Sequence, residues 1–384
     1  MTTWKTVKFG DVVRQVKDKV DPKQSGLVRY IAGEHMDTDN LHIRHWGTIG
    51  DNYLGPAFHM RFKPGQVLYG SRRTYLRKVA FADFEGITAN TTYVLESKDP
   101  DVLLPELLPF IMQTDSFNEH SIKQSKGSVN PYINFSDIDW YEFPLPPLDE
   151  QRRIADLLWA VDDYLTQLSE SLVKLEYIRK SFLFEKFNQL MKRKEKLVKI
   201  SQAGEVLMGR QLSPKYTKNI SPKPYLRVAN VFDGYLDLSD VKSMDFNITE
   251  SQKFLLKFGD VLLNEGQARE LVGRSCIYRD EIPNCCFQNT LLRFRPKLTS
   301  SEYAHYFFQY CQYSGRFVEK AKQTTSIAHL GSGRFLEMSF PVPESLEEKE
   351  IVGSLNEINR SMTQLSETKS RAQVMKAEIL KKNF

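Results

Sequence analysis

Two stretches of the sequence combine basic, aromatic and amide side chains in a pattern that suits contact with nucleic acid. Between Asn52 and Ala82 there is no acidic residue, and a tyrosine stands among arginines and lysines from Arg72 to Lys78. Arginine and lysine neutralise phosphates, and arginine or glutamine can form paired hydrogen bonds with guanine or adenine. Charge clusters are also common on solvated faces, so charge alone does not decide between the two interpretations.

The predicted DNA contacts fall at corresponding places in the two halves of the chain. One group follows a short apolar run in each half, and a second group occupies a polar loop just before a proline-rich motif. In the first half these residues are Arg72, Arg73, Tyr75, Arg77, Lys78, Lys123 and Lys126. In the second half they are Gln267, Arg269, Arg274, Lys322 and Gln323.

The motifs of enzymes that modify or unwind DNA are missing from the sequence. Asn130-Pro131-Tyr132 lacks the second proline of the loop that holds a flipped adenine, and no glycine-rich donor loop precedes it, so we interpret it as a turn. No G-x-x-x-x-G-K-S/T phosphate loop is present. We therefore predict a chain with no catalytic residues.

Metal and cofactor sites are not indicated either. His35, His42 and His45 have no carboxylate or cysteine at ligand spacing. The four cysteines all lie in the second half and form no C-x-x-C pair, which favours reduced structural thiols over zinc ligands. We predict no metal and no cofactor.

An internal repeat must position the predicted contacts. Phe143-Pro144-Leu145-Pro146 returns as Phe340-Pro341-Val342-Pro343 after 197 residues, and the same offset continues through the residues that follow. The preceding parts correspond less regularly, with offsets that drift between 194 and 199. The chain is therefore two copies of one unit, each a globular part followed by a long helix.

Apolar residues at alternating steps of three and four follow each proline motif and predict a coiled-coil seam. The seam residues are Leu158, Val161, Leu165, Leu168 and Leu172 in the first copy and Leu355, Ile358, Met362 and Leu365 in the second. The seam could be buried between chains or within one chain. We favour an antiparallel pair within one chain, because the chain supplies both helices.

Each globular part is predicted to contain several strands and one helix. The helix is expected over about 103–119 in the first half and 301–322 in the second, and Pro105 and Pro109 suggest that the first helix starts late or is broken. The predicted fold class is α+β, with two mixed domains joined by two long helices in an antiparallel coiled coil and an internal pseudo-twofold repeat. The predicted domains are 1–147, 148–190, 191–344 and 345–384, in the order recognition domain, helix, recognition domain, helix.

Composition is that of a globular protein, with 384 residues, 41% hydrophobic and 12% aromatic side chains and a net charge of +5. No apolar run approaches the roughly 18 residues of a membrane span, and the first residues lack the apolar region of a signal peptide. We expect a cytoplasmic protein with no membrane partner.

Residues 144–155, PLPPLDEQRRIA, resemble the start of the spacer helix in specificity (S) subunits of type I restriction-modification systems. The order of domain, helix, domain, helix is similar to that family over the whole chain. The second copy departs from the motif, with Glu348 in place of the glutamine and Ser345 in place of the leucine, which we expect to alter a partner contact.

The resemblance implies two target-recognition domains, each reading one half of a split asymmetric site in double-stranded DNA. It implies that the helices space the domains and dock two methyltransferase (modification) subunits, with motor-nuclease (restriction) subunits adding cleavage in phage defence. An alternative remains, in which the repeat is a coiled-coil scaffold that pairs two protein partners without reading DNA. A fused enzyme is disfavoured by the missing motifs.

Overall fold

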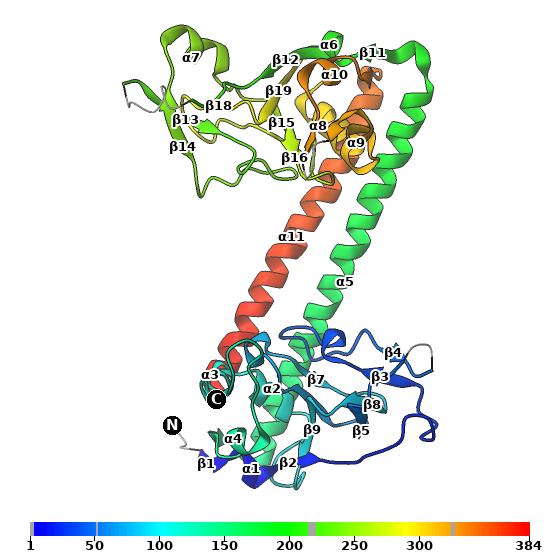
Figure 1. The fold of residues 1–384 in the computed structure, drawn as a ribbon, viewed down its shortest axis with the longest axis vertical. Helices are drawn as coiled ribbons and strands as arrows, with labels where there is room; N and C mark the ends of the chain where they lie inside the picture. The colour runs from blue at the N-terminus through cyan, green and yellow to red at the C-terminus, as the bar shows by residue number, and fades with distance from the viewer. Residues whose placement is uncertain (1–3, 51–52, 214–219, 324–326) are drawn as a thin grey trace. The chain divides into compact units, whose positions relative to one another are not determined.

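The computed structural model describes residues 4–50, 53–213, 220–323 and 327–384 (Figure 1). The chain forms two compact units, and neither is a continuous segment. Unit 1 contains Met1–Glu170 and Ser366–Phe384, and unit 2 contains Ser171–Leu365. Each unit therefore holds part of both long helices, α5 (Leu148–Lys192) and α11 (Ser345–Asn383). We call the rest of each unit head 1 and head 2.

A four-stranded antiparallel sheet with the same strand order forms the centre of each head. In head 1 the order is β2 (Val13–Val16), β9 (Thr92–Ser97), β6 (Val67–Gly70) and β7 (Val79–Phe81). In head 2 it is β12 (Gly204–Met208), β19 (Leu291–Pro296), β15 (Val261–Asn264) and β17 (Ser275–Ile277). The predicted internal repeat therefore extends to the strand topology of the heads.

A second sheet distinguishes the heads. Head 1 has four strands in the order β4 (Gly47–Thr48), β3 (Arg29–Ile31), β8 (Gly86–Ala89) and β5 (Phe58–Phe62). Head 2 has three, in the order β14 (Lys242–Asp245), β13 (Pro222–Leu226) and β18 (Cys286–Phe287), and carries the helix α7 (Ile248–Phe254) after β14. The chain has therefore diverged most where the second sheet is built.

Two-stranded sheets join each head to its proline motif. β1 (Lys5–Lys8) pairs with β10 (Glu142–Leu145), and β11 (Leu197–Lys199) pairs with β22 (Ser339–Pro341). The repeated phenylalanines Phe143 and Phe340 lie on β10 and β22, and each is buried in a hydrophobic cluster of its own head. The repeated motif is thus conserved between the halves because it closes each head onto the next helix.

The helices of the heads differ in part from the prediction. In head 1 the helical region begins late, at Leu108, as predicted from the prolines. Its break lies at Thr114 and not at a proline: it divides α2 (Leu108–Gln113) from α3 (Asp115–Gln124), whose first turn the Thr114 hydroxyl caps, and the region ends five residues beyond the predicted 119. In head 2 the prediction of one helix to Lys322 was wrong. Gly315, with φ of 77°, separates α8 (Ser301–Tyr313) from α9 (Arg316–Lys320), and Lys322 lies in a strand.

Short elements complete the heads. They are α1 (Phe9–Val12), α4 (Phe135–Ile138), α6 (Ile200–Ala203), α10 (Ser332–Leu336), β16 (Gly266–Gln267), β20 (Lys322–Gln323) and β21 (Ala328–His329). Three-residue 3₁₀ turns lie at Gly33–His35, Thr74–Leu76 and Lys194–Lys196.

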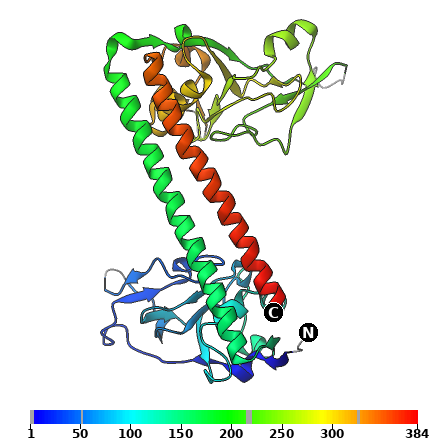
Figure 2. The same ribbon diagram turned by 180° about the vertical axis from the view of Figure 1, so that it is seen from behind.

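The long helices run antiparallel within each unit (Figure 2). In unit 1 the Lys376 ammonium of α11 lies 2.5 Å from an oxygen of Asp162 on α5. In unit 2 the opposite ends meet: Arg193, the residue after α5, pairs at 2.9 Å with Glu347 near the start of α11. The fold is therefore α+β with an antiparallel coiled coil, as predicted.

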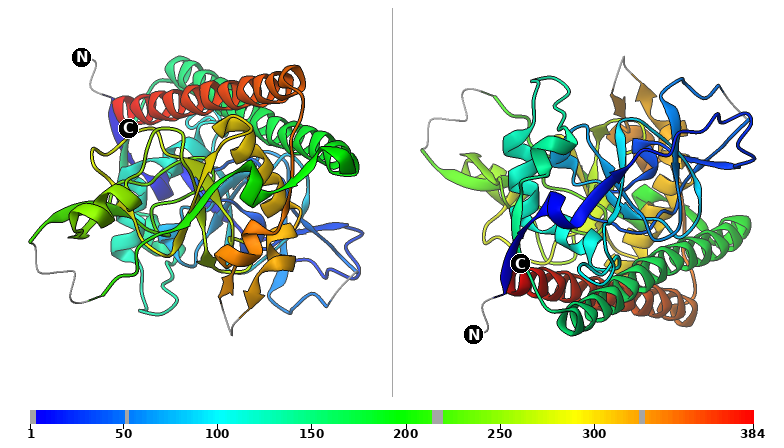
Figure 3. Two further views of the ribbon diagram at one scale, coloured as in Figure 1. Left: turned by 90° about the horizontal axis from the view of Figure 1, so that it is seen from above. Right: turned by 90° about the horizontal axis from the view of Figure 1, so that it is seen from below.

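Each head lies along one side of the long helices (Figure 3). Within each unit, buried side chains of the head and of the helices form one hydrophobic cluster. Ile154 and Leu158 of α5 belong to the core of head 1. Ile351 and Leu355 of α11 occupy the same positions of the repeat and belong to the core of head 2.

In the part of the chain that is described, no helix is both long and apolar enough to cross a membrane.

The glutamine of the motif is held inside unit 1. Gln151 is buried, and its amide donates to the carbonyls of Val102 and Pro146, each at 2.9 Å, and accepts the Leu104 amide at 2.8 Å. In unit 2 the corresponding Glu348 accepts the Ser300 amide at 2.7 Å, its one side-chain hydrogen bond to the described residues. The exchange of glutamine for glutamate therefore changes an internal junction of the unit, between the head and the start of the helix.

Candidate nucleic-acid interface

In each head the two predicted contact segments are joined by antiparallel backbone pairing with a third segment. In head 1, Tyr132 forms backbone bridges to both Arg72 and Lys126. In head 2, β21 pairs with β16 on one side and β20 on the other, so that His329 faces both Gly266 and Lys322. Two loops predicted separately from the sequence thus form one surface in each head.

Arg72, Arg73 and Tyr75 are exposed at this surface of head 1. The Arg72 guanidinium stacks 4.8 Å above the ring of Tyr132. Arg73 has a left-handed backbone, with φ of 49°, and its amide donates to the Pro131 carbonyl at 2.6 Å. Its guanidinium makes no hydrogen bond or ion pair with the residues that the structure describes. These side chains are available to phosphates and bases.

Arg77 is held inside head 1, which separates it from Arg72 and Arg73. Its guanidinium contacts Asp39 and Asp115, each at 2.7 Å, and donates to the Gln113 carbonyl at 2.8 Å. Burial would lower the pKa of Arg77, but the hydrogen bonds to the two carboxylates raise it above its ordinary value. Lys78 likewise donates to the Gly33 carbonyl at 2.5 Å. Both side chains tie loops of the head together.

The second polar loop of head 1 contributes two lysines of different kinds. Lys126 pairs with Asp137 at 2.9 Å, and this hydrogen bond lowers the pKa of the Asp137 carboxyl below its ordinary value. Lys123 is exposed near the end of α3 and forms no ion pair within the described ranges. Lys123 therefore carries a charge that a phosphate could neutralise.

Head 2 offers a less basic surface. Gln267 is half-buried, and its side-chain oxygen accepts the Ala268 amide at 3.0 Å, which leaves its amino group as a donor. Arg269 and Lys322 are exposed. Arg274 is held back, since its Nε donates to the Val231 carbonyl at 3.0 Å and burial lowers its pKa. The side chain of Gln323 and residues 324–326 lie outside the described part of the structure.

Tyr132 and His329 were missed at the level of sequence. They occupy the same position in the two arrangements and are separated by 197 residues, the offset of the proline motif. His329 contacts Glu265 at 3.1 Å. The one signal in the sequence is this shared spacing, which pairs the two positions but does not mark either as a contact.

The predicted seam residues lie on the less exposed faces of the long helices. Leu158, Val161, Leu168 and Leu355 are buried, and Leu165, Leu172, Ile358, Met362 and Leu365 are half-buried. Since Leu158 and Leu355 also belong to the cores of the heads, the seam is shared between the helix pair and the domains that it carries.

Among the residues that the structure describes, no group of three His, Cys, Asp or Glu side chains is placed to hold a metal ion. The four cysteines are free and buried, and burial raises the pKa of Cys286 to about 11, so that the thiol is protonated at neutral pH.

Two segments match a family described as the type I restriction modification DNA specificity domain, residues 1–176 and 193–375. These segments cover most of the chain, and each contains one head and part of the helix that follows it. The chain therefore belongs to this family, and the two heads are its target-recognition domains.

Individual relatives are distant. The EcoDI specificity subunit of Escherichia coli is 26% identical over 189 residues, which is 48% of this chain and 41% of that protein. The HindI specificity subunit of Haemophilus influenzae is 22% identical over 46% of this chain and 39% of its own length. The chain thus aligns with about two fifths of these relatives. The MjaVIII specificity subunit of Methanocaldococcus jannaschii is 20% identical over 98% of this chain and 91% of its own length.

Solved structures share the fold over nearly the whole chain. The S subunit of a type I restriction-modification system from M. genitalium is 14% identical, with a TM-score of 0.62 over 99% of this chain and 96% of that one. A chain from a solved type I R-M system is 18% identical, with a TM-score of 0.61 over 100% and 98%.

Proposed function

We propose that this chain is the specificity subunit of a cytoplasmic type I restriction-modification complex. In this role it binds a bipartite, asymmetric site in double-stranded DNA, each head reading one half. It docks two methyltransferase subunits for adenine methylation and motor-nuclease subunits for restriction. The chain contributes no catalytic residue and no cofactor, and chemistry on DNA belongs to its partners.

One observation carries the proposal. Two heads with the same central sheet present different side chains from corresponding loops, Arg72 and Arg73 in head 1 where head 2 has Gly266 and Gln267. Backbone amides and positive charges position a protein on DNA, and side chains that meet base edges specify the sequence. Two heads that share the central sheet but differ in the side chains of their contact loops are suited to binding two different half-sites.

The first experiment measures DNA binding by the methyltransferase assembled with this chain. Changing Arg72 and Arg73 to Ala should weaken binding and flatten its salt dependence, because fewer counterions are released. The matched control changes Lys5 and Lys8, exposed on β1, to Ala and removes the same charge. Equal affinity and salt slope in the two variants would show that the arginines form a solvated face.

A second experiment tests the two-part site. Replacing residues 191–344 by the corresponding domain of another family member should change one half-site in the methylome and leave the other unchanged. The scaffold alternative predicts that scrambling either half-site has no effect on binding.

A third experiment concerns chemistry. The purified chain should transfer no methyl group, and methylation should appear only when a modification subunit is added. Methyl transfer by the chain alone would show that the chain has a catalytic site of its own.

A further inference from the structure

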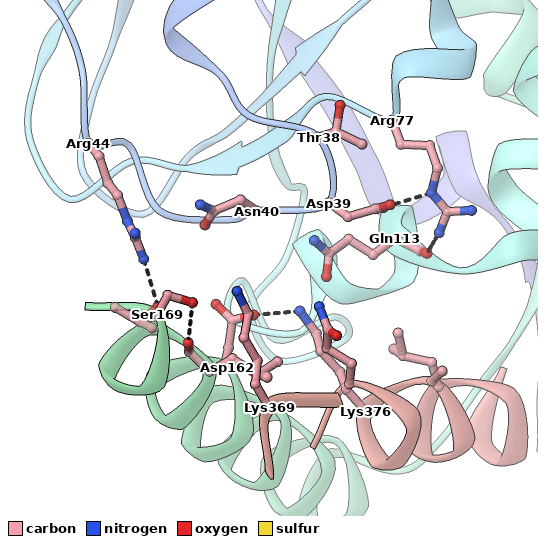
Figure 4. A pocket seen from close by; sticks show the side chains of 15 residues that line it. Thr38, Asp39, Asn40, Arg44, Arg77, Gln113, Asp162, Ser169, Lys369 and Lys376 are labelled. Atoms are coloured by element: carbon pink, nitrogen blue, oxygen red, sulfur yellow. Dashed lines mark hydrogen bonds and ion pairs between the residues drawn. The ribbon is translucent and has the colours of Figure 1, made fainter. Parts of the chain in front are cut away.

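A cavity of about 420 Å³ lies in unit 1, where head 1 meets the helix pair (Figure 4). Its walls are the 38–44 loop, the end of α2 and facing parts of α5 and α11. The surface predicted to contact DNA contributes only Arg77 to this wall. The volume is within the range of sites for small molecules.

The cavity carries an excess of positive charge. Lys376 is neutralised by Asp162 at 2.5 Å, and Arg77 by Asp39 at 2.7 Å. The other two lining cations, Arg44 of the loop and Lys369 of α11, form no ion pair with any carboxylate in the described ranges.

Arg44 is held in place without being neutralised. One of its guanidinium nitrogens donates to the hydroxyl of Thr166 on α5 at 3.0 Å. Thr166 and Ser169 add hydroxyl groups to the wall, and Asn40 adds an amide. A lining rich in donors with two unneutralised cations is suited to an oxyanion.

A buried amide completes the wall. Gln113, at the end of α2, is only 4% exposed, and neither its amide nitrogen nor its amide oxygen has a hydrogen-bond partner among the described residues. Figure 4 shows Gln113 and Lys369 on opposite sides of the same space. Buried amides without partners are destabilising, and most are satisfied in folded proteins.

Unit 2 shows how a similar amide is satisfied. Gln309 of α8, also 4% exposed, donates to Asp233 at 2.6 Å and accepts from Arg179 at 3.2 Å. Asp233 and Arg179 correspond in the repeat to Asp39 and Lys376 of unit 1.

In unit 1 those two residues are engaged elsewhere. Asp39 pairs with Arg77, and Lys376 pairs with Asp162. The side-chain amide of Gln113 therefore lies unpaired beside the cavity. The corresponding Gln309 of unit 2, in contrast, connects its head to the helix pair through its hydrogen bonds.

We propose that this cavity binds a small oxyanion, either a phosphate group or a carboxylate group of a small molecule. Arg44 and Lys369 contact the anion from opposite sides, and the Gln113 amide turns to donate to it. The ligand contacts the 38–44 loop and α11 together, so its binding holds head 1 to the helix pair. The proposal does not depend on DNA recognition.

The test is thermal melting of the full chain in inorganic phosphate, citrate or chloride at matched ionic strength. Binding to the folded state raises the melting temperature with ligand concentration. We expect a saturable rise with phosphate or citrate and none with chloride, and the anion that acts distinguishes phosphate from carboxylate recognition. A cavity filled only with water gives no saturable rise with either anion, which would overturn the proposal.

Variants locate the site. Lys369→Met keeps the aliphatic stem of a half-buried side chain and should weaken anion binding roughly tenfold or more, the effect of losing one charged hydrogen bond. Gln113→Leu should also weaken binding, without loss of stability in the absence of anion. The control Gln309→Leu should lower the melting temperature and leave the anion response unchanged.

Isothermal titration of the parent chain with the same anions measures binding independently of melting. An unchanged dissociation constant in both Lys369→Met and Gln113→Leu would place any anion elsewhere and contradict the proposal.

Discussion

The two heads build one junction with opposite charges. In head 1, Arg14 of β2 pairs with Glu96 of β9 at 2.6 Å, and Glu96 also accepts from the Gln66 amide at 2.6 Å. In head 2 the residues at these strand positions are Glu205 and Arg295, so acid and base have changed places. The two do not pair with each other there, because Glu205 forms its ion pair with Arg293, on the same strand as Arg295.

A third residue of this junction also differs between the heads. Asp260 occupies the place of Gln66 and binds Arg295 through two contacts of 2.7 Å. Both side chains also accept a backbone amide three residues earlier, at 2.8 Å. The comparison shows that the repeat preserves backbone geometry and hydrogen bonding, whereas the charges can be exchanged as a set.

The largest effect is expected in the helix seam, where corresponding positions differ in burial. Leu165 and Leu168 of α5 correspond to Met362 and Leu365 of α11, and Leu168 is 5% exposed whereas Leu365 is half-buried. Changing Leu165 and Leu168 to Asp should lower the free energy of unfolding by several kcal/mol for each buried unpaired charge.

Changing Met362 and Leu365 to Asp should cost less, because the second position is more exposed. Thermal melting and binding of methyltransferase subunits are the measurements, with Leu157→Asp, at a position 41% exposed, as control. If the first double variant melts like the parent, the seam does not hold the helices together.

The next effect concerns the buried ion pair of unit 1. Asp162→Asn places at 162 the residue found at the corresponding position 359, and it leaves Lys376 buried without a carboxylate. The loss should be about 3–5 kcal/mol. In unit 2 the corresponding cation, Arg179, is paired with Glu176 at 3.0 Å, so adding Gln373→Glu, at the position of Glu176, should restore part of the stability.

The same pair predicts a pH dependence. Burial alone would raise the pKa of Asp162, but the His42 imidazole, 3.0 Å away, and the charge of Lys376 lower it below its ordinary value. The stabilisation is therefore fully present above the unfolded pKa of about 4 and is lost as the pH falls through the lower folded value. Melting of parent and Asp162→Asn at a series of acidic pH values should converge. A constant difference between them would contradict the assignment.

A smaller effect should follow from exchanging the charge set of the heads. Gln66→Asp alone places a carboxylate beside Glu96 and should destabilise the protein by about 1–3 kcal/mol. Adding Glu96→Arg together with Arg14→Glu recreates the Asp260–Arg295 pair without placing two arginines opposite each other, and should recover stability in urea unfolding. If the triple variant is no more stable than Gln66→Asp, the two junctions are not interchangeable.

Substitutions at Arg73 and Gln267, which occupy corresponding positions in the loops of the two heads, should have the smallest effect on stability. They should instead change the DNA sequence that each head prefers. Arg73→Gln should alter only the half-site read by head 1, and Gln267→Arg only the other, because arginine favours guanine and glutamine favours adenine by about 1–3 kcal/mol. Sequencing of methylated sites gives the result. A change in both half-sites would argue against separate reading.

Local pattern was sufficient to predict the long helices and the repeat. The prolines before Leu148 and Ser345, together with the spacing of the leucines, predicted where α5 and α11 begin and which faces they bury. These signals are local, since helix periodicity and the missing amide of proline act within a few residues. The strand runs near Val67 and Val261 were predictable for the same reason.

Which basic side chains are free was decided by tertiary structure. Arg73 and Arg77 stand in one basic run, yet Arg77 is bound by Asp39 and Asp115, each separated from it by 38 residues, and Arg73 is exposed. The pairing of Asp162 with Lys376, across 214 residues, likewise depends on the antiparallel meeting of two helices. Composition determines how many charges a segment carries, but only the folded chain brings a distant carboxylate within reach of one guanidinium and leaves its neighbour in solvent.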